Sequence, residues 1–122
     1  MRALVIDDSK EMRTIQKSIL LEMNMAASEA ENGVEALELL KNDSDYDLIV
    51  LDIDMPEMDG IETLKEIKKE ASSKDIPVLM CSTLGDRDSV FESIRSGAKN
   101  YVRKPFTADG FVRKVELVLG LD

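Results

Sequence analysis

The chain has 122 residues, a length that fits one domain whose core needs no disulfide bonds. Its 25 acidic and 16 basic residues give a formal net charge of −9, and because no basic stripe is visible, we expect no nucleic-acid partner. The sequence contains no histidine, which excludes Ser-His-Asp and Cys-His catalysis, phosphotransfer through a histidine of this chain, and most zinc sites.

The chain also lacks the signals of an exported or membrane-bound protein. The longest apolar run near the N-terminus, residues 3–6, is too short for a signal peptide or a membrane span. Cys81 is the only cysteine and lies in an apolar run, so we expect a buried packing residue in a reducing compartment. No repeat or linker divides the sequence. We therefore expect one domain over residues 1–122, in a cytoplasmic and monomeric protein.

The first half of the chain predicts three strands, each followed by a helix. Residues 3–7 (ALVID) form a buried-strand pattern, residues 25–29 a weaker one, and residues 47–52 (DLIVLD) the clearest one. Ser9 is a candidate N-cap for the first helix, and Asn32-Gly33 is a turn signal before the second. The apolar residues that recur at helical spacing are Met12, Ile15, Ile19 and Met23, then Val34, Leu37 and Leu40, then Ile61, Leu64 and Ile67.

The second half predicts two more strand-and-helix units. Residues 78–82 (VLMCS) follow Pro77 as a fourth strand, and residues 100–103 form a short fifth strand. Asp86 is a candidate cap for a helix that Gly97 would end, and Thr107 is a candidate cap for the last helix. The apolar positions of these two helices are Val90, Phe91 and Ile94, then Phe111, Val115, Val118 and Leu119.

Five such units predict a doubly wound α/β domain, (βα)5, with a five-stranded parallel sheet. Helices would cover both faces through right-handed crossovers. The apolar strands lack the alternation of a half-exposed sheet, which agrees with burial on both faces.

Polar residues collect where the predicted strands end. In such sheets, ligands bind outside the carboxyl ends of the strands. One polar residue at one strand end would mean little, since an aspartate pair can cap a helix and a lone lysine is usually solvated. The residues are Asp7 and Asp8 after the first strand, Asp52 after the third, Ser82 and Thr83 at the fourth, and Lys104 after the fifth.

These residue types point to a metal and to phosphoryl transfer. Several carboxylates without an imidazole favour a hard cation, Mg²⁺ in particular. An aspartate carboxylate can attack phosphorus and form an acyl phosphate, while a metal and a lysine neutralise the phosphoryl oxygens. Two carboxylates 4 Å apart repel by ~4 kcal/mol at an effective dielectric of ~20, so such a cluster needs positive charge.

Four segments, ALVIDD, DLIVLDIDMPEMDG, IPVLMCST and NYVRKPF, resemble the response-regulator receiver domains of two-component signalling. The likeness covers essentially the whole chain and is strongest to the single-domain chemotaxis type, the CheY-like regulators. It implies the strand order 2-1-3-4-5, phosphorylation of Asp52, and Mg²⁺ bound by Asp8, Asp52 and the backbone carbonyl of Asp54. Asp7 would act through water or orient the metal.

The resemblance also implies a switch. Ser82 is similar to the family's switch hydroxyl and Lys104 to its lysine, and the bond between Lys104 and Pro105 would be cis. Tyr101 matches an aromatic position that turns inward when the hydroxyl moves to the phosphoryl group. Because strands alternate, only one of the adjacent hydroxyls of Ser82 and Thr83 can face the site. An ungapped match favours Ser82. The positions of Asp54 and Leu84 tune the phosphoryl lifetime in the family.

The implied function is a phosphorylatable switch that catalyses only its own phosphorylation and dephosphorylation. A sensor histidine kinase, or a small acyl phosphate, would supply the phosphoryl group. The surface of the fourth helix, fifth strand and fifth helix would then bind a downstream protein, such as the flagellar motor switch or a phosphotransfer protein. A phosphorelay intermediate or a phosphate sink would use the same site.

Two alternatives come from other classes. LDIDMP resembles the Asp-x-Asp motif of haloacid-dehalogenase-type phosphatases, with Asp52 as nucleophile and Asp54 as acid/base. However, that superfamily places the pair after its first strand, and here it follows the third. A flavodoxin-like electron carrier shares the strand order but needs a hydroxyl- and glycine-rich phosphate loop, where this chain has an acidic segment at residues 8–11.

Overall fold

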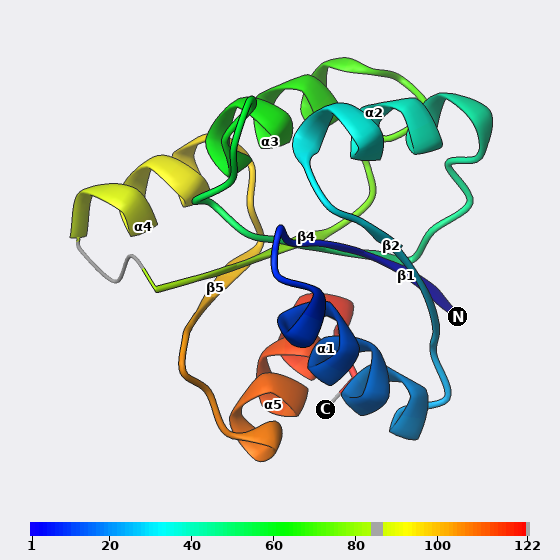
Figure 1. The fold of residues 1–122 in the computed structure, drawn as a ribbon, viewed down its shortest axis with the longest axis vertical. Helices are drawn as coiled ribbons and strands as arrows, with labels where there is room; N and C mark the ends of the chain where they lie inside the picture. Colours follow the sequence, from blue (N-terminus) through cyan, green and yellow to red (C-terminus); the bar gives the residue numbers. More distant parts are fainter. Residues whose placement is uncertain (84–86, 122) are drawn as a thin grey trace.

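The computed structural model describes residues 1–83 and 87–121, in which five strands alternate with five helices (Figure 1). The strands are β1 (Arg2–Ile6), β2 (Ala26–Ala30), β3 (Leu48–Leu51), β4 (Val78–Ser82) and β5 (Asn100–Arg103). The helices are α1 (Lys10–Glu22), α2 (Gly33–Asn42), α3 (Gly60–Lys69), α4 (Arg87–Arg95) and α5 (Ala108–Leu119). All strand pairs are parallel and the order is β2-β1-β3-β4-β5, which confirms the predicted doubly wound fold.

Helices cover both faces of the sheet. Figure 1 shows α1 and α5 on one face and α2, α3 and α4 on the other. Alternate residues of each strand enter different cores: in β1, Leu4 and Ile6 pack towards α2 and α3, while Ala3 and Val5 pack towards α1 and α5. This double burial is the reason that the strands read as continuous apolar runs.

Side-chain caps begin α1, α2, α3 and α5. Ser9 and Thr107 each accept a hydrogen bond from the backbone N–H three residues later, as predicted. The predicted cap Asp86 and the predicted lifetime position Leu84 lie outside the described residues. After α4, Gly97 adopts a φ of 113°, a conformation that favours glycine and ends the helix.

In α5, the predicted apolar face is the buried one. Phe111 and Val115 are fully buried and Val118 is 5% exposed. In α4 and α1, the apolar residues at helical spacing mark the buried face only in part, since Val90, Ile19 and Met23 pack against the cores from partly buried positions. Phe91 is 63% exposed and Ile94 is 46% exposed, because α4 turns Ser93 towards the sheet instead.

Helix α1 departs furthest from its apolar pattern. Ile15 is 47% exposed, whereas Arg13, Gln16 and Leu20 are buried. The buried face therefore includes two long polar side chains, and the guanidinium of Arg13 is hydrogen-bonded where it is buried.

Cys81 is fully buried and free, as expected for a packing residue. Burial raises the pKa of its thiol to about 12, so it is not a nucleophile at neutral pH. In the described part of the chain, no helix combines the length and the apolar character needed to cross a bilayer.

Candidate functional site

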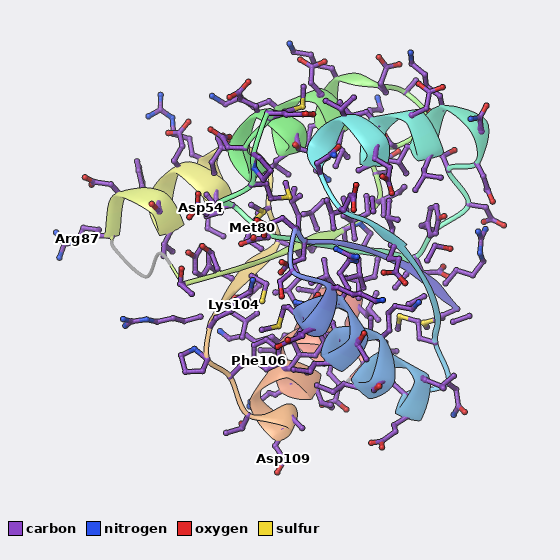
Figure 2. All side chains as sticks on the ribbon, in the orientation of Figure 1. Asp54, Met80, Arg87, Lys104, Phe106 and Asp109 are labelled. Carbon is purple, nitrogen blue, oxygen red and sulfur yellow. The ribbon has the colours of Figure 1, made fainter. Side chains whose placement is uncertain are left out.

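The sheet ladder continues one residue beyond three of its strands and so positions the predicted site residues. The backbone N–H of Asp7 donates to Ala30 (3.1 Å), that of Asp52 to Ile6 (2.9 Å), and that of Lys104 to Ser82 (2.9 Å). All three residues are therefore held at the carboxyl edge of the sheet. Figure 2 shows Lys104 on the segment between β5 and α5.

Three of the predicted carboxylates form one cluster. Each of Asp7, Asp8 and Asp52 offers an oxygen that lies within 4.8 Å of the others. Asp7 is 1% exposed and Asp52 is 5% exposed, while Asp8 opens to solvent. Carboxylates this close and this buried repel each other strongly, so the cluster needs positive charge.

Lys104 supplies part of that charge. Its Nζ donates to Asp7 Oδ2 at 2.6 Å and lies 3.6 Å from Asp52 Oδ1. Burial opposes the charge of this ammonium, but its hydrogen bond to Asp7 and the charges of Asp52 and Asp7 outweigh it and raise the pKa of Lys104. Lys104 is therefore a cation shared by two of the three carboxylates, and the cluster keeps a net negative charge.

The remaining charge imbalance appears at Asp52. Burial raises the pKa of Asp52 to about 6, the charge of Lys104 lowers it, and the charges of Asp7 and Asp8 raise it further. A second cation would therefore stabilise the ionised form of the Asp52 carboxylate. Oxygen donors from three carboxylates, one of them open to solvent, fit the preference of Mg²⁺ for a few carboxylates plus water.

Asp54 lies on the loop after β3, labelled in Figure 2, and its side chain is exposed. Its backbone N–H donates a hydrogen bond that lowers the pKa of Asp52. The ligand expected from Asp54 is its backbone carbonyl, and that contact stays a prediction.

The loop that carries Asp54 is anchored at both ends. Gly60 donates its N–H to the carbonyl of Ile53 at 2.7 Å, and a Cβ at Gly60 would lie only 2.0 Å from the carbonyl oxygen of Asp52. Asp59 caps α3 through the N–H of Glu62. The start of α3 therefore packs directly against the backbone of Asp52, which requires glycine at position 60.

The switch candidates Ser82 and Tyr101 lie on the neighbouring strands β4 and β5. Ser82 is fully buried at the end of β4, while Thr83 is exposed, so burial favours Ser82 as the inward hydroxyl. Tyr101 pairs with Met80 in the sheet, is 8% exposed, and packs in the core under α2, α3 and α4. Its ring therefore occupies the inward position. The peptide bond between Lys104 and Pro105 is cis, as predicted.

Arg13 is a residue near the site that the apolar pattern did not indicate. Its Nη1 donates to the backbone carbonyl of Asp7 at 2.8 Å, directly beneath the acid pair. The sequence feature that could have indicated Arg13 is its position one turn after the N-cap Ser9, at the end of the helix that faces the acids.

Comparisons with known proteins agree with this geometry. The family model of the response regulator receiver domain matches residues 3–116. The chain is 42% identical over 120 residues to the chemotaxis protein CheY of Bacillus subtilis, covering 97% of each chain. It is 39% identical over 121 residues to the chemotaxis protein CheY1 of Helicobacter pylori, covering 98% of each.

Solved structures give the same result. The chemotaxis protein CheY4 of Vibrio cholerae has a TM-score of 0.90 at 28% identity, with 97% of this chain and 98% of that chain covered. A chain in the CheX–CheY–BeF3–Mg²⁺ complex of Borrelia burgdorferi has a TM-score of 0.89 at 30% identity, covering 95% of this chain and 87% of that one. With the family match, the strand order and the acid cluster in agreement, the chain belongs to the response regulator receiver domains of two-component signalling.

Proposed function

We propose that the chain is a chemotaxis response regulator, phosphorylated at Asp52 in a Mg²⁺-dependent reaction with a histidine kinase. The observation that carries this proposal is the position of the Lys104 ammonium, 2.6 Å from Asp7 and 3.6 Å from Asp52 within one carboxylate cluster. A role in chemotaxis is supported by its relatives, which are chemotaxis proteins. The proposed protein is a cytoplasmic monomer, with residues 1–122 as one receiver domain.

Asp8, Asp52 and the backbone carbonyl of Asp54 would hold Mg²⁺, and Asp7 would orient it. When bound, the metal neutralises phosphoryl oxygens as negative charge gathers at the site. The solvent-open carboxylate of Asp8 leaves room for water and for the donor phosphate. A structure of a relative in a complex that contains Mg²⁺ supports this choice of cation.

The reaction transfers one phosphoryl group. A carboxylate oxygen of Asp52 attacks the phosphorus of a phosphohistidine, the P–N bond breaks, and the imidazole of the kinase leaves as the acyl phosphate forms. Lys104 pairs with the phosphoryl oxygens, and the hydroxyl of Ser82 donates to one of them. In the dephosphorylation step, water attacks phosphorus, the bond between phosphorus and the Asp52 oxygen breaks, and inorganic phosphate leaves.

The new charge of about −1.5 to −2 drives the switch. Movement of Ser82 towards the phosphoryl group leaves space near the inward ring of Tyr101 and stabilises that position. The affected surface is α4, β5 and α5, where Phe91 and Ile94 expose apolar area to a partner protein. The partner would be a flagellar motor switch protein or a phosphotransfer protein.

The phosphatase alternative requires Asp54 as a catalytic acid beside Asp52. The carboxylate of Asp54 is exposed, and the cluster consists instead of Asp7, Asp8 and Asp52. The family match over residues 3–116 also favours the receiver. A phosphorelay intermediate or phosphate sink remains the alternative with the same chemistry. Phosphoryl return from Asp52 to a histidine phosphotransfer protein would favour that role over motor control.

Intact-protein mass spectrometry tests the proposal. The natural chain is incubated with acetyl phosphate and Mg²⁺ and quenched rapidly, beside Asp52→Asn, Asp54→Asn and a sample in EDTA. We expect one phosphoryl adduct in the natural chain and in Asp54→Asn, and none in Asp52→Asn or in EDTA. An adduct in Asp52→Asn, or the absence of one in the natural chain with either acetyl phosphate or a phosphorylated kinase, contradicts the proposal.

A further inference from the structure

Arg13 is a buried cation at the start of α1 that links three elements. It is 9% exposed. Its Nη1 donates to the carbonyl of Asp7, after β1, at 2.8 Å, and its Nε donates to Glu29 Oε1, on β2, at 2.7 Å. One planar guanidinium therefore fixes the backbone that follows β1 relative to both α1 and β2.

Glu29 holds the other side of Arg13 in place. Its second oxygen accepts from Lys17 Nζ at 2.6 Å, so two cations share one carboxylate. The hydrogen bonds from Lys17 and then Arg13 lower the pKa of Glu29, which keeps it ionised at neutral pH. The ionised carboxylate of Glu29 thus holds one side of Arg13, while the Nη1 of Arg13 donates to the backbone carbonyl of Asp7.

The carbonyl that Arg13 binds belongs to the peptide bond between Asp7 and Asp8. Asp7 has further restraints, because its carboxylate accepts from the N–H of Ser9 and from Lys104. The carboxylate of Asp8, by contrast, accepts no hydrogen bond from the described residues. Its place in the cluster therefore depends on the backbone that carries it.

We propose that Arg13 is a positioning residue for the metal site: it holds the peptide bond before Asp8 so that this carboxylate faces Asp52. The inference rests on the proposed function, since it needs Mg²⁺ to bind at Asp8 and Asp52. Residues that orient metal ligands typically change metal affinity by 10–100-fold when they are replaced.

Two effects of Arg13 on Mg²⁺ binding have opposite signs, which makes the inference testable. Arg13 carries positive charge, and by charge alone its removal strengthens the binding of a cation. If Arg13 positions Asp8, its removal weakens binding. A purely structural role lowers the stability of the metal-free fold without weakening Mg²⁺ binding to the folded protein.

The experiment is calorimetric titration with Mg²⁺ of the full chain and of Arg13→Met, Arg13→Lys and Lys17→Met. Urea unfolding in EDTA measures the stability of each metal-free protein separately. We expect Arg13→Met to bind Mg²⁺ about tenfold more weakly than the natural chain. Arg13→Lys keeps the charge but cannot make both hydrogen bonds, so we expect a loss of a few fold. Lys17→Met is the matched control, because it removes a cation from Glu29 without touching Asp7, and we expect unchanged or slightly tighter binding.

Equal or tighter Mg²⁺ binding in Arg13→Met overturns the inference. If that variant does not fold, Arg13→Lys decides, and natural affinity in it overturns the inference as well. Absence of Mg²⁺ binding in the natural chain contradicts the proposed metal site itself, so the two failures are distinguishable.

Discussion

Helices α1 and α5 lie side by side on one face of the sheet, yet they bury different chemistry (Figure 1). The buried residues are Phe111, Val115 and Val118 in α5, and Arg13, Gln16 and Leu20 in α1. Helix α5 thus contributes mainly apolar burial, while α1 gives part of its buried face to a guanidinium and an amide. The difference follows from position, because α1 begins directly after the acid pair and α5 does not. In this chain, the helix that begins beside the acid pair therefore has a partly polar buried face.

The largest expected effect tests the apolar half of this comparison. Phe111→Ala removes a fully buried ring from the core under α5, so we expect a loss of about 3–5 kcal/mol in the free energy of unfolding. The matched control is Phe91→Ala, whose ring on α4 is 63% exposed and for which we expect a change below about 1 kcal/mol. Urea unfolding in EDTA measures both. Similar losses in the two variants would contradict the assignment of the buried faces.

A second test concerns the charged edge that α1 supports. The pKa of Asp52 is raised from 3.8 to about 6, so the folded protein binds this proton more tightly than the unfolded chain. Ionised Asp52 therefore destabilises the metal-free fold above pH 6, and the penalty disappears as the pH falls towards 4. At 1.36 kcal/mol per pKa unit, Asp52→Asn should be up to about 3 kcal/mol more stable than the natural chain at pH 7.

Unfolding of both proteins in EDTA between pH 4 and pH 8 checks this effect. We expect the advantage of Asp52→Asn to grow between pH 4 and pH 6 and then to level off. Mg²⁺ should reduce it at pH 7, because only the natural chain keeps all three carboxylates. An advantage that does not change with pH would mean that Asp52 titrates normally in the fold.

The smallest effect concerns Gln16 in the middle of α1. Its Nε2 donates to Cys81 Sγ at 3.4 Å, but its buried Oε1 has no partner among the described residues. Because an unsatisfied buried carbonyl is costly, we expect Gln16→Met to raise stability by about 1 kcal/mol. Ile15→Met, next to it on the exposed side, should change stability by less than about 0.5 kcal/mol. A loss of stability in Gln16→Met would indicate a bound water or another donor at Oε1.

The sequence predicted the strands and the site better than the helix faces. Asp7, Asp52 and Lys104 come together because parallel strands end at one edge, while the strand order was predicted from the family resemblance. The face of α1 was not predictable from apolar spacing. Burial of Arg13 depends on its partners Asp7, which follows β1, and Glu29, which lies on β2, and periodicity within one helix contains no information about them.

Helix α4 shows a related limit. Phe91 and Ile94 match a helical apolar pattern, and such a pattern indicates a helix without telling which partner covers its apolar residues. In this chain the sheet side of α4 is occupied by Ser93 and not by these two residues. The apolar pattern of α4 is therefore consistent with a surface for another protein.

Because Gly60 packs against the backbone of Asp52, the loop between these residues should tolerate substitutions at exposed positions better than changes in its length. Pro56 is exposed, so many replacements there should be neutral, whereas Ile53 and Met55 are buried and Glu57 adopts a φ of 68°. Insertions and deletions should disrupt the site, because Gly60 is hydrogen-bonded to Ile53 and packs against the carbonyl of Asp52. Among sequences that keep this site, the exposed positions of the loop should therefore vary in residue type, while the number of residues in the loop stays constant.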